Sequence, residues 1–269
     1  MKASVIMSTY NAEEWLEKVI WGFSVQTEQD FEIIIADDGS GPATRELIDR
    51  LRKQIPMALV HVWQEDNGFQ KTQILNKAIV AAKSDYLIFT DGDCIPRNDF
   101  VAVHLAHARE GYFLSGGYFK LPMATSLAIS KDDILAQRCF DVAWLKQHGL
   151  AAKKLGKLTA KGFKAKWLNF ITPTKASWNG HNASAFKKEL VAVNGFNTKM
   201  QYGGEDRELG ERLFNKGIKS RQIRYSAICI HLDHARGYVS DEAWENNNTI
   251  REYTRKNKVV RTLTGIEEL

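Results

Sequence analysis

The segment FTDGDCIP, residues 89–96, places two aspartates directly after an apolar run. Asp91 and Asp93 are separated only by Gly92, and two like charges at this spacing repel each other unless a cation lies near them. Carboxylate oxygens are the ligands of hard divalent cations, and such ions commonly carry a phosphate group. The segment therefore predicts a site for Mg²⁺ or Mn²⁺. A plain surface turn, ended by Pro96, is the alternative.

Three further polar turns follow strand-like runs. The strand-like runs cover residues 3–9, 31–35, 58–63 and 85–89, and segments with apolar residues at helical spacing lie between them. This alternation predicts an α/β fold in which helices cover both faces of a parallel sheet. Ligands bind beyond the carboxyl ends of such strands, so these turns should converge with the aspartates at one sheet edge. Their polar residues are Asn11, Asp37, Asp38 and Asn67.

Asn11 also stands where a helix N-cap is expected. Glu14 follows it three residues on, just before Trp15 and Leu16, which is the capping-box spacing. We therefore expect the Asn11 side chain to cap the first helix.

Composition limits the class of protein. The chain has 269 residues, 44% hydrophobic and 26% charged, which suits one large or two small globular domains. Neither a membrane-spanning run nor a cleavable signal is recognisable in the sequence. The three cysteines lack CxxC spacing, which disfavours a disulfide framework or a zinc-thiolate site and favours a reducing cytoplasm. The net charge of +5 allows an anionic partner without requiring one.

Two common nucleotide motifs are missing or incomplete. The sequence contains no GxxxxGK[ST] run, which disfavours a P-loop. GSGPAT, residues 39–44, has two glycines of the dinucleotide fingerprint, but Thr44 replaces the third and the segment follows the second strand instead of the first. Both observations favour carboxylates with a cation as the phosphate-binding device.

The order of these motifs resembles that of family 2 glycosyltransferases of the GT-A fold. MSTYNAEEWLEKVI, IIIADDGS, EDNGFQKTQILNKAI and FTDGDCIP are similar to the successive donor-side motifs of that family. WNGHNASAFKKELVAVNGFN and YGGEDRELGERL resemble its acceptor-side motifs, in the galactosyltransferase-like form also found in bacterial chondroitin-type polymerases. The resemblance covers residues 3–122 and 177–234 in the same order. It implies a Rossmann-like, mostly parallel sheet flanked by helices, and inverting transfer of a sugar, usually from a uridine diphosphate (UDP) sugar.

The resemblance implies a nucleotide site on the donor side. For the Asp37–Ser40 turn, a simple turn with a helix cap is the alternative; for Asn67 it is a simple turn, and for Lys71 a solvated helix lysine. The residues expected to contact nucleotide are Thr9, Tyr10, Asn11, Asp37, Asp38, Asn67, Lys71, Asp91 and Gly92.

YGGEDRELGERL, residues 202–213, holds the candidate catalytic carboxylates. Its glycines allow backbone close to a ligand, and a flexible loop with an acidic first helical turn is the alternative. The resemblance makes Asp206 the base that removes the acceptor hydroxyl proton and gives Glu205 a role in acceptor binding. The dipole at the helix N-terminus is expected to favour the ionised form of Asp206. Gly204, Asn179 and His181 are the further acceptor-site candidates.

ICIHLDHARGY, residues 228–238, ends a strand with two histidines. The resemblance makes Asp93 the direct metal ligand and supplies one histidine from this segment, either His231 or His234. A structural role is the alternative for each, and the sequence does not choose between them.

A basic stretch separates the two resembling regions. Residues 138–175 contain nine Lys or Arg and one acid, Asp141, with aromatic and leucine residues interleaved. The alternatives are a solvated helical insertion, a contact with an anionic membrane face, and a grip on a phosphorylated or acidic acceptor. Acidic turns around the predicted site disfavour nucleic acid as a partner. We divide the chain into a nucleotide-sugar half (1–125), a basic helical insertion (126–176), an acceptor and catalytic half (177–240) and a helical tail (241–269).

The sequence as a whole predicts a metal-dependent inverting glycosyltransferase, cytoplasmic or peripheral at the inner membrane face. Its expected acceptor is a glycan or glycolipid such as bacterial lipopolysaccharide core or capsule; the sugar, the linkage and the oligomeric state stay open. A sugar-phosphate nucleotidyltransferase is the same-fold alternative, but STYNAEEW lacks the Gly-rich basic loop typical of that class. A binding module with an inactive site is the non-enzymatic alternative, which the intact set Asp91, Asp93 and Asp206 disfavours.

Overall fold

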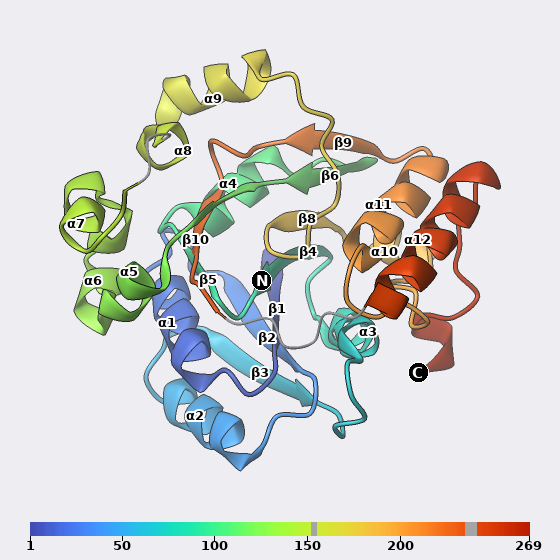
Figure 1. Ribbon diagram of the computed structural model, residues 1–269, viewed down its shortest axis with the longest axis horizontal. Helices are drawn as coiled ribbons and strands as arrows, with labels where there is room; N and C mark the ends of the chain where they lie inside the picture. Colours follow the sequence, from blue (N-terminus) through green and yellow to red (C-terminus); the bar gives the residue numbers. More distant parts are fainter. Residues whose placement is uncertain (152–154, 235–240) are drawn as a thin grey trace.

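The protein has an α/β fold built on two sheets, as the computed structural model shows (Figure 1). The structure describes residues 1–151, 155–234 and 241–269. The larger sheet has the order β3-β2-β1-β4-β8-β6-β9, and the smaller has the order β5-β10-β7. The strands are β1 (Ala3–Thr9), β2 (Phe31–Asp37), β3 (Ala58–Trp63), β4 (Tyr86–Asp91), β5 (Cys94–Pro96), β6 (Tyr112–Ser115), β7 (Gly117–Lys120), β8 (Ala183–Phe186), β9 (Lys219–Gln222) and β10 (Ile228–His231).

The larger sheet is mostly parallel, as the alternation of strands and helices predicts. β1 pairs in parallel with β2 and β4, β2 with β3, and β6 with β9. β8 is the exception, because it lies antiparallel between β4 and β6. The four strands expected from the sequence lie within two residues of their predicted bounds. Their parallel arrangement brings the ends of β1, β2 and β4 to one edge, as expected.

Both faces of this sheet are buried, and successive strand residues enter different cores. Val5 and Met7 of β1 join one apolar cluster, whereas Ile6 joins the other. A strand buried on both faces has this property, because its side chains alternate between faces. α1 (Glu13–Ser24), α2 (Pro42–Arg52) and α4 (Phe100–His107) contribute to the first cluster. α3 (Lys71–Ala81), α10 (Lys187–Ala192) and α11 (Glu205–Asn215) contribute to the second.

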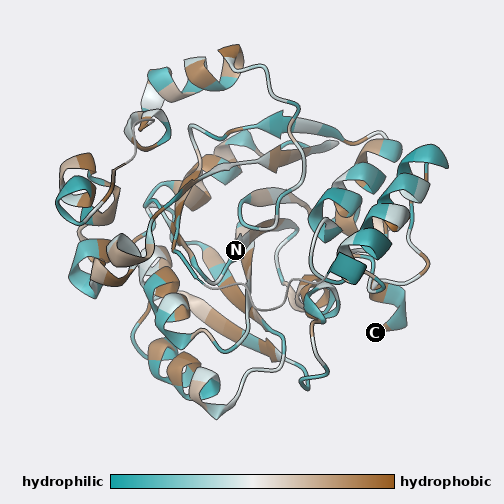
Figure 2. Cartoon of the chain, in the orientation of Figure 1, coloured by the Kyte–Doolittle hydropathy of each residue, from teal (hydrophilic) through white to brown (hydrophobic). Residues whose placement is uncertain are grey.

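The region between β7 and β8 is helical, as predicted for the basic insertion. It runs along the periphery of the molecule in Figure 1 and carries both apolar and polar segments in Figure 2. Its elements are α5 (Met123–Ala128), α6 (Lys131–Leu135), the 3₁₀ turn η1 (Arg138–Phe140), α7 (Val142–Gln147), α8 (Gly156–Thr159) and α9 (Gly162–Ile171). α12 (Asp241–Lys256) packs beside α11, and η2 (Ile266–Glu268) lies near the C-terminus. The proposed division of the chain at residues 125, 176 and 240 stays a prediction.

The expected N-cap at Asn11 is wrong. Helix α1 begins at Glu13, and the residue before it, Ala12, makes no side-chain cap. Asn11 has φ +44°, and its side chain accepts a hydrogen bond from the Gly41 N–H at 3.0 Å instead. Asn tolerates this left-handed conformation better than most residues, so Asn11 joins the first turn to the second and leaves the helix uncapped.

The three cysteines are buried and unpaired, so none forms a disulfide. Within the described ranges, no helix combines the length and the apolar character needed to cross a bilayer.

Candidate active site

A cavity of about 760 Å³ opens at the carboxyl edge of the parallel strands. It draws its lining from both resembling halves of the chain, because β1, β4 and α3 meet α11 and β10 there. Most of the predicted site residues line it: Thr9, Tyr10, Asn11, Asp38, Lys71, Asp91, Gly92, Asp93, His181, Glu205, Asp206, His231 and His234.

Asp91 ends β4 and is held by two donors. Its Oδ1 accepts hydrogen bonds from Ser8 Oγ at 2.9 Å and from Lys71 Nζ at 2.8 Å. Burial alone would raise the pKa of Asp91, but the Lys71 charge and hydrogen bond outweigh it and the pKa lies well below its usual range. Asp91 is therefore a stable anion. The next position has no room for a side chain, because a Cβ on Gly92 would lie only 2.9 Å from the Ser8 carbonyl oxygen.

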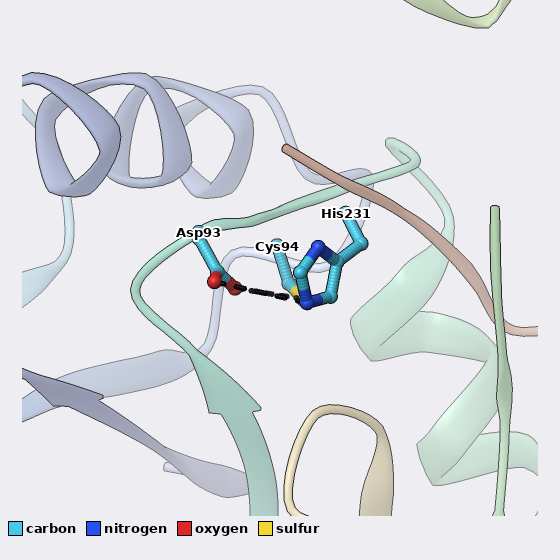
Figure 3. A group of neighbouring side chains, drawn as sticks. All are labelled: Asp93, Cys94 and His231. Atoms are coloured by element: carbon cyan, nitrogen blue, oxygen red, sulfur yellow. Dashed lines mark hydrogen bonds and ion pairs between the residues drawn. The ribbon is translucent and has the colours of Figure 1, made fainter. Parts of the chain in front are cut away.

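Asp93 faces a histidine from β10, and Figure 3 shows these two side chains with Cys94 pointing toward one another. Asp93 Oδ2 lies 3.7 Å from His231 Nε2 and 2.9 Å from His234 Nε2. His231 Nδ1 lies 2.7 Å from the Leu232 carbonyl oxygen, and a carbonyl can only accept, so Nδ1 carries the proton. In neutral His231, Nε2 is therefore an acceptor that faces a carboxylate.

Two acceptors that face each other across 3.7 Å suit a cation between them. Asp93, Cys94 and His231 each offer a ligand atom, and these atoms lie within 4.8 Å of one another. The Cys94 thiol donates to Asp93 Oδ1 at 3.3 Å, and burial raises the pKa of this thiol well above its usual value. A protonated, soft sulfur is a poor ligand for Mg²⁺ or Mn²⁺, so the donor set that fits such an ion is Asp93 with the histidines.

Asp206 is the second residue of α11, next to the carboxylate of Glu205. Gly180 N–H donates to Asp206 Oδ2 at 2.9 Å, while Oδ1 has no hydrogen-bond partner in the described parts of the chain. Glu205, beside it, accepts from the Gly203 N–H at 2.8 Å.

The pKa of Asp206 contradicts the expectation that the helix dipole favours its ionised form. Burial and the charge of Glu205 raise this pKa to about 7, against the opposing charge of Lys71. Desolvation and a like charge thus outweigh the dipole of the helix N-terminus. A carboxylate with a pKa near neutrality matches the requirement for a general base at neutral pH.

The far side of the cavity carries the polar turns after β1 and β2. Asp38 accepts from the Gln64 side chain at 2.7 Å and from the Gln70 N–H at 2.9 Å, and burial raises its pKa to about 6. Thr9 Oγ1 is buried and has no hydrogen-bond partner within the described residues. A ligand in the cavity could satisfy this hydroxyl.

Asp66 was not predicted, although it lines the cavity and accepts from the Tyr10 hydroxyl at 2.8 Å. It also accepts from the Gly68 N–H at 3.1 Å, which closes the turn around Asn67. An aspartate two residues before a glycine is a turn signal, so the sequence held a clue to its position.

Four predicted residues lie outside the cavity lining. Asp37 is fully buried, and its oxygens meet the Ser40 N–H at 2.9 Å and His61 Nε2 at 2.8 Å. Both oxygens are engaged in supporting the turn, which leaves none directed at a ligand. Asn67 is exposed. Asn179 donates to Ser115 Oγ at 2.9 Å, and Gly204 is the N-cap of α11 with φ +91°.

The helical insertion reaches the margin of the site through α8. Lys157 Nζ donates to the Tyr118 carbonyl at 3.3 Å and lies 5.4 Å from the Tyr118 ring centre. The Tyr118 ring in turn lies 4.5 Å from the ring of His181 and 5.9 Å from that of His231. Burial lowers the pKa of His181 to about 4, so its imidazole is neutral at neutral pH. Lys153 and Lys154, two of the basic residues in the 138–175 stretch, lie outside the described residues.

Comparisons with known proteins identify what the sequence and the fold are similar to. Residues 4–129 match the family described as glycosyl transferase family 2, and residues 174–235 match the N-terminal domain of galactosyltransferase. A fragment of S. aureus TarS (residues 1–349), solved with UDP-GlcNAc, superposes with a TM-score of 0.63 at 13% identity, covering all of this chain and 69% of that fragment. A mannosyltransferase of Pyrobaculum calidifontis, solved with GDP-Man and Mn²⁺, gives 0.59 at 20% identity, covering 98% of this chain and 65% of the other. The fold is thus the GT-A fold of glycosyltransferases.

Curated relatives carry the same class of name. The uncharacterized glycosyltransferase YfnE of Bacillus subtilis is 27% identical over 87% of this chain and 65% of its own length. Chondroitin synthase of Escherichia coli is 25% identical over 86% of this chain and 34% of its own length. The chain therefore spans about two thirds or less of the length of these relatives. The first part of the chain, residues 4–129, is thus similar to the family 2 glycosyltransferases.

Proposed function

We propose that this chain transfers a sugar from a UDP-sugar to a hydroxyl group of a glycan acceptor, with a divalent cation and with inversion at the anomeric carbon. One observation carries the proposal: Asp91, Asp93, His231 and Asp206, from distant parts of the sequence, line a single cavity. This combination would provide a cation site and a base within the same cavity.

The proposed donor is a UDP-sugar, held at the turns after β1 and β2. Asp38 and the partnerless Thr9 hydroxyl offer hydrogen bonds to a base or ribose, with Tyr10 and Asp66 at the rim. The solved complexes of TarS with UDP and UDP-GlcNAc support this choice within the same fold. Asp37 has a supporting role in the proposal, because both of its oxygens hold the turn.

Asp93 and His231, with His234 close by, would hold Mn²⁺ or Mg²⁺. Such an ion supplies neutralisation of the charge that develops on the leaving diphosphate. Asp91 stays anionic beside Lys71, whose ammonium group is positioned to approach the same phosphates. The Mn²⁺ in the related mannosyltransferase structure supports a divalent ion in this fold.

Asp206 acts as the base in the proposed reaction. Its partnerless Oδ1 takes the proton of the acceptor hydroxyl as the acceptor oxygen forms a bond to the anomeric carbon. The bond from that carbon to the UDP oxygen breaks in the same displacement, and UDP leaves with the bonding electron pair. Attack opposite the leaving group inverts the anomeric configuration. Glu205, fixed by the Gly203 N–H, is placed to bind the acceptor next to Asp206.

The proposed acceptor is a bacterial surface glycan, for example a lipopolysaccharide core, a capsule or a lipid-linked precursor. Relatives named chondroitin synthase and GalNAc(5)-diNAcBac-PP-undecaprenol β-1,3-glucosyltransferase support a growing glycan as substrate. We propose a cytoplasmic enzyme that works at the inner membrane face. Neither the nucleotidyltransferase nor the inactive-module alternative has a specific observation in its favour.

The test is a transfer assay with a panel of UDP-sugars, GDP-mannose as the comparison donor, Mn²⁺, and bacterial surface oligosaccharides as acceptors. Release of UDP measures turnover, and NMR of the product gives its anomeric configuration. Turnover with at least one UDP-sugar and an inverted product is the expected result. Preference for GDP-mannose would overturn the donor assignment, and a retained configuration would overturn the base mechanism.

A further inference from the structure

Helix α9 presents an apolar stripe to solvent. Four side chains share one helical face, at spacings of four, seven and eight residues from the first. They are unusually exposed for their type: Phe163 is 83% exposed, Trp167 52%, Phe170 88% and Ile171 45%. Exposed single apolar residues are ordinary, but a contiguous aromatic face indicates an interaction surface. α9 lies at the edge of the molecule, as Figures 1 and 2 show.

The opposite face of α9 is fixed to the body of the protein. Ala165 is buried there, and Asn169 Nδ2 donates to Ser226 Oγ at 2.8 Å. The Tyr225 N–H donates back to Asn169 Oδ1 at 3.0 Å, and Gln222 Nε2 donates to the Asn169 carbonyl at 2.7 Å. These contacts fix the rotation of α9 about its own axis. The aromatic face on the other side of the helix therefore points to solvent.

Lysines flank the apolar stripe without carboxylate partners. Residues 155–175 contain five lysines and no aspartate or glutamate. Lys161, Lys164 and Lys166 are exposed, and none of them forms an ion pair within the described residues. An apolar face bordered by uncompensated positive charge is the pattern of a helix that lies in the interface of an anionic bilayer. A protein partner would have to supply both an apolar groove and a ring of acids.

We propose that α9 docks the protein on an anionic lipid bilayer, with Phe163, Trp167 and Phe170 inserted at the level of the headgroups. Lys161, Lys164 and Lys166 then contact the lipid phosphates.

α8, which precedes α9, connects this surface to the active site. Lys157 contacts Tyr118, and the Tyr118 ring packs on His181 and His231 at the cavity margin. Docking through α9 would therefore hold the cavity near the membrane, where a lipid-anchored acceptor lies. The benefit of bringing the cavity close to a lipid-anchored acceptor rests on the proposed function. The docking of α9 on a bilayer does not.

The first test is co-sedimentation of the whole chain with vesicles of phosphatidylglycerol and phosphatidylethanolamine, and with vesicles of phosphatidylcholine alone. The wild-type protein is expected to bind the anionic vesicles in low salt and to bind the neutral ones at least about tenfold more weakly. The variant F163S/F170S should lose at least about tenfold in partitioning. Serine and phenylalanine have similar helix propensities, so α9 should persist.

The matched control for this variant is Y253S/L263S. It also removes two exposed apolar side chains, at 64% and 90% exposure, from a different part of the surface. This control should bind vesicles as the wild type does. Both variants should bind UDP with unchanged affinity in calorimetry, which shows that the fold and the donor site are intact.

The second test reverses charge in K161E/K164E/K166E. Because each lysine near an anionic surface contributes about fivefold, we expect a loss of at least about tenfold that shrinks as salt is raised. The control K53E/K83E/K216E makes the same charge change at exposed lysines elsewhere and should have a much smaller effect.

Two results would overturn the docking proposal: no binding of wild type to anionic vesicles, or equal binding by F163S/F170S and wild type. Concentration-dependent self-association that F163S/F170S abolishes, without vesicle binding, would assign α9 to a contact between copies instead. If the wild type neither binds UDP nor transfers a sugar, the proposed function is contradicted. The vesicle-binding result does not depend on that outcome.

Discussion

Three aspartates in one cavity are held in different states by their neighbours. Asp91 is kept anionic by Lys71 and Ser8, whereas Asp206 has its pKa raised to about 7 by burial and by Glu205. Asp93 faces the acceptor nitrogen of His231. Environments that push the pKa values of neighbouring carboxylates apart divide the work between them. In the proposed reaction they would separate a phosphate-side anion (Asp91), a metal ligand (Asp93) and a base (Asp206).

Asp206→Asn tests the base. Asparagine keeps the shape and the hydrogen bond from the Gly180 N–H but removes the basic oxygen. We expect kcat to fall by roughly 10²–10⁴, the usual contribution of a positioned base, with donor affinity unchanged. Steady-state kinetics with separate UDP calorimetry measures both. Near-native kcat would assign the base to another residue, and Glu205 would be the next candidate.

The same substitution should change stability in a pH-dependent way. Because the folded state raises the pKa of Asp206 from 3.8 to about 7, the folded protein holds this proton more tightly than the unfolded chain does. Stability from this group is complete below pH about 4 and is lost as pH rises through about 7. Asp206→Asn removes that loss, so its Tm should exceed the wild-type Tm at pH 8 by several degrees. At pH 4 the two should be alike; a lower Tm for the variant at pH 8 would contradict the raised pKa.

Most residues expected at the site line one cavity, and their roles stay predictions. The sequence could not show which neighbours hold each of these side chains. Asp93, Asp206 and His231 line the cavity as predicted, because each follows a recognisable strand or glycine pair. Asp37 does not line the cavity, because one of its oxygens is hydrogen-bonded to His61 on the neighbouring strand. A cross-strand partner of this kind depends on register, which the local pattern does not state.

At the scale of elements, the site depends on where α11 begins. Gly203 and Gly204, with φ of +109° and +91°, bring the chain into Glu205, and the segment before β8 supplies the Gly180 N–H. A Cβ on Gly180 would lie 2.8 Å from Asp206 Oδ2. The close approach of these two segments therefore positions the carboxylate of Asp206, the proposed base.

Gly180→Ala should displace Asp206 without touching the donor site. We expect kcat to fall by about 10- to 100-fold, since small misplacements of catalytic groups have effects of this size, while UDP affinity stays the same. Gly156→Ala is the control, because a Cβ there meets nothing within 4 Å. If Gly180→Ala has the same kcat as Gly156→Ala and the wild type, the close contact between Gly180 and Asp206 does not position the base.

The regular elements of the first half were predictable, and the irregular ones were not. β1 to β4 are long apolar runs whose two buried faces leave a clear pattern. β8 is only four residues long, ASAF, and three of them have small side chains; it pairs antiparallel to β4 from almost a hundred positions away. Nothing in its local sequence specifies that pairing. Asn11, in its left-handed conformation, likewise accepts a hydrogen bond from the Gly41 N–H. This contact joins two separate turns, so a local capping pattern cannot reveal it.

At the scale of the whole molecule, the cavity is lined by segments that are distant in sequence. β1, β4 and α3 line the proposed donor side, while α11 and β10 carry the proposed base and the histidines. Ligand binding across such a junction should stabilise the fold as a unit.

The nucleotide should therefore raise the melting temperature selectively. UDP with Mn²⁺, at about 100 times its Kd, is expected to raise Tm by about 5–10 °C. GDP and ADP at the same concentration should give clearly smaller shifts. Differential scanning fluorimetry measures this directly, and an equal shift with GDP would contradict a uridine-specific donor site.

The most direct test of the central claim, a metal-dependent UDP-sugar site at Asp93, is calorimetric titration of UDP into wild type and Asp93→Ala, each with Mn²⁺ and with chelator. We predict that wild type binds UDP at least about tenfold more tightly with Mn²⁺, because the ion links Asp93 and His231 to the diphosphate. Asp93→Ala should bind weakly and equally in both conditions. Equal wild-type affinity with and without chelator would contradict the claim.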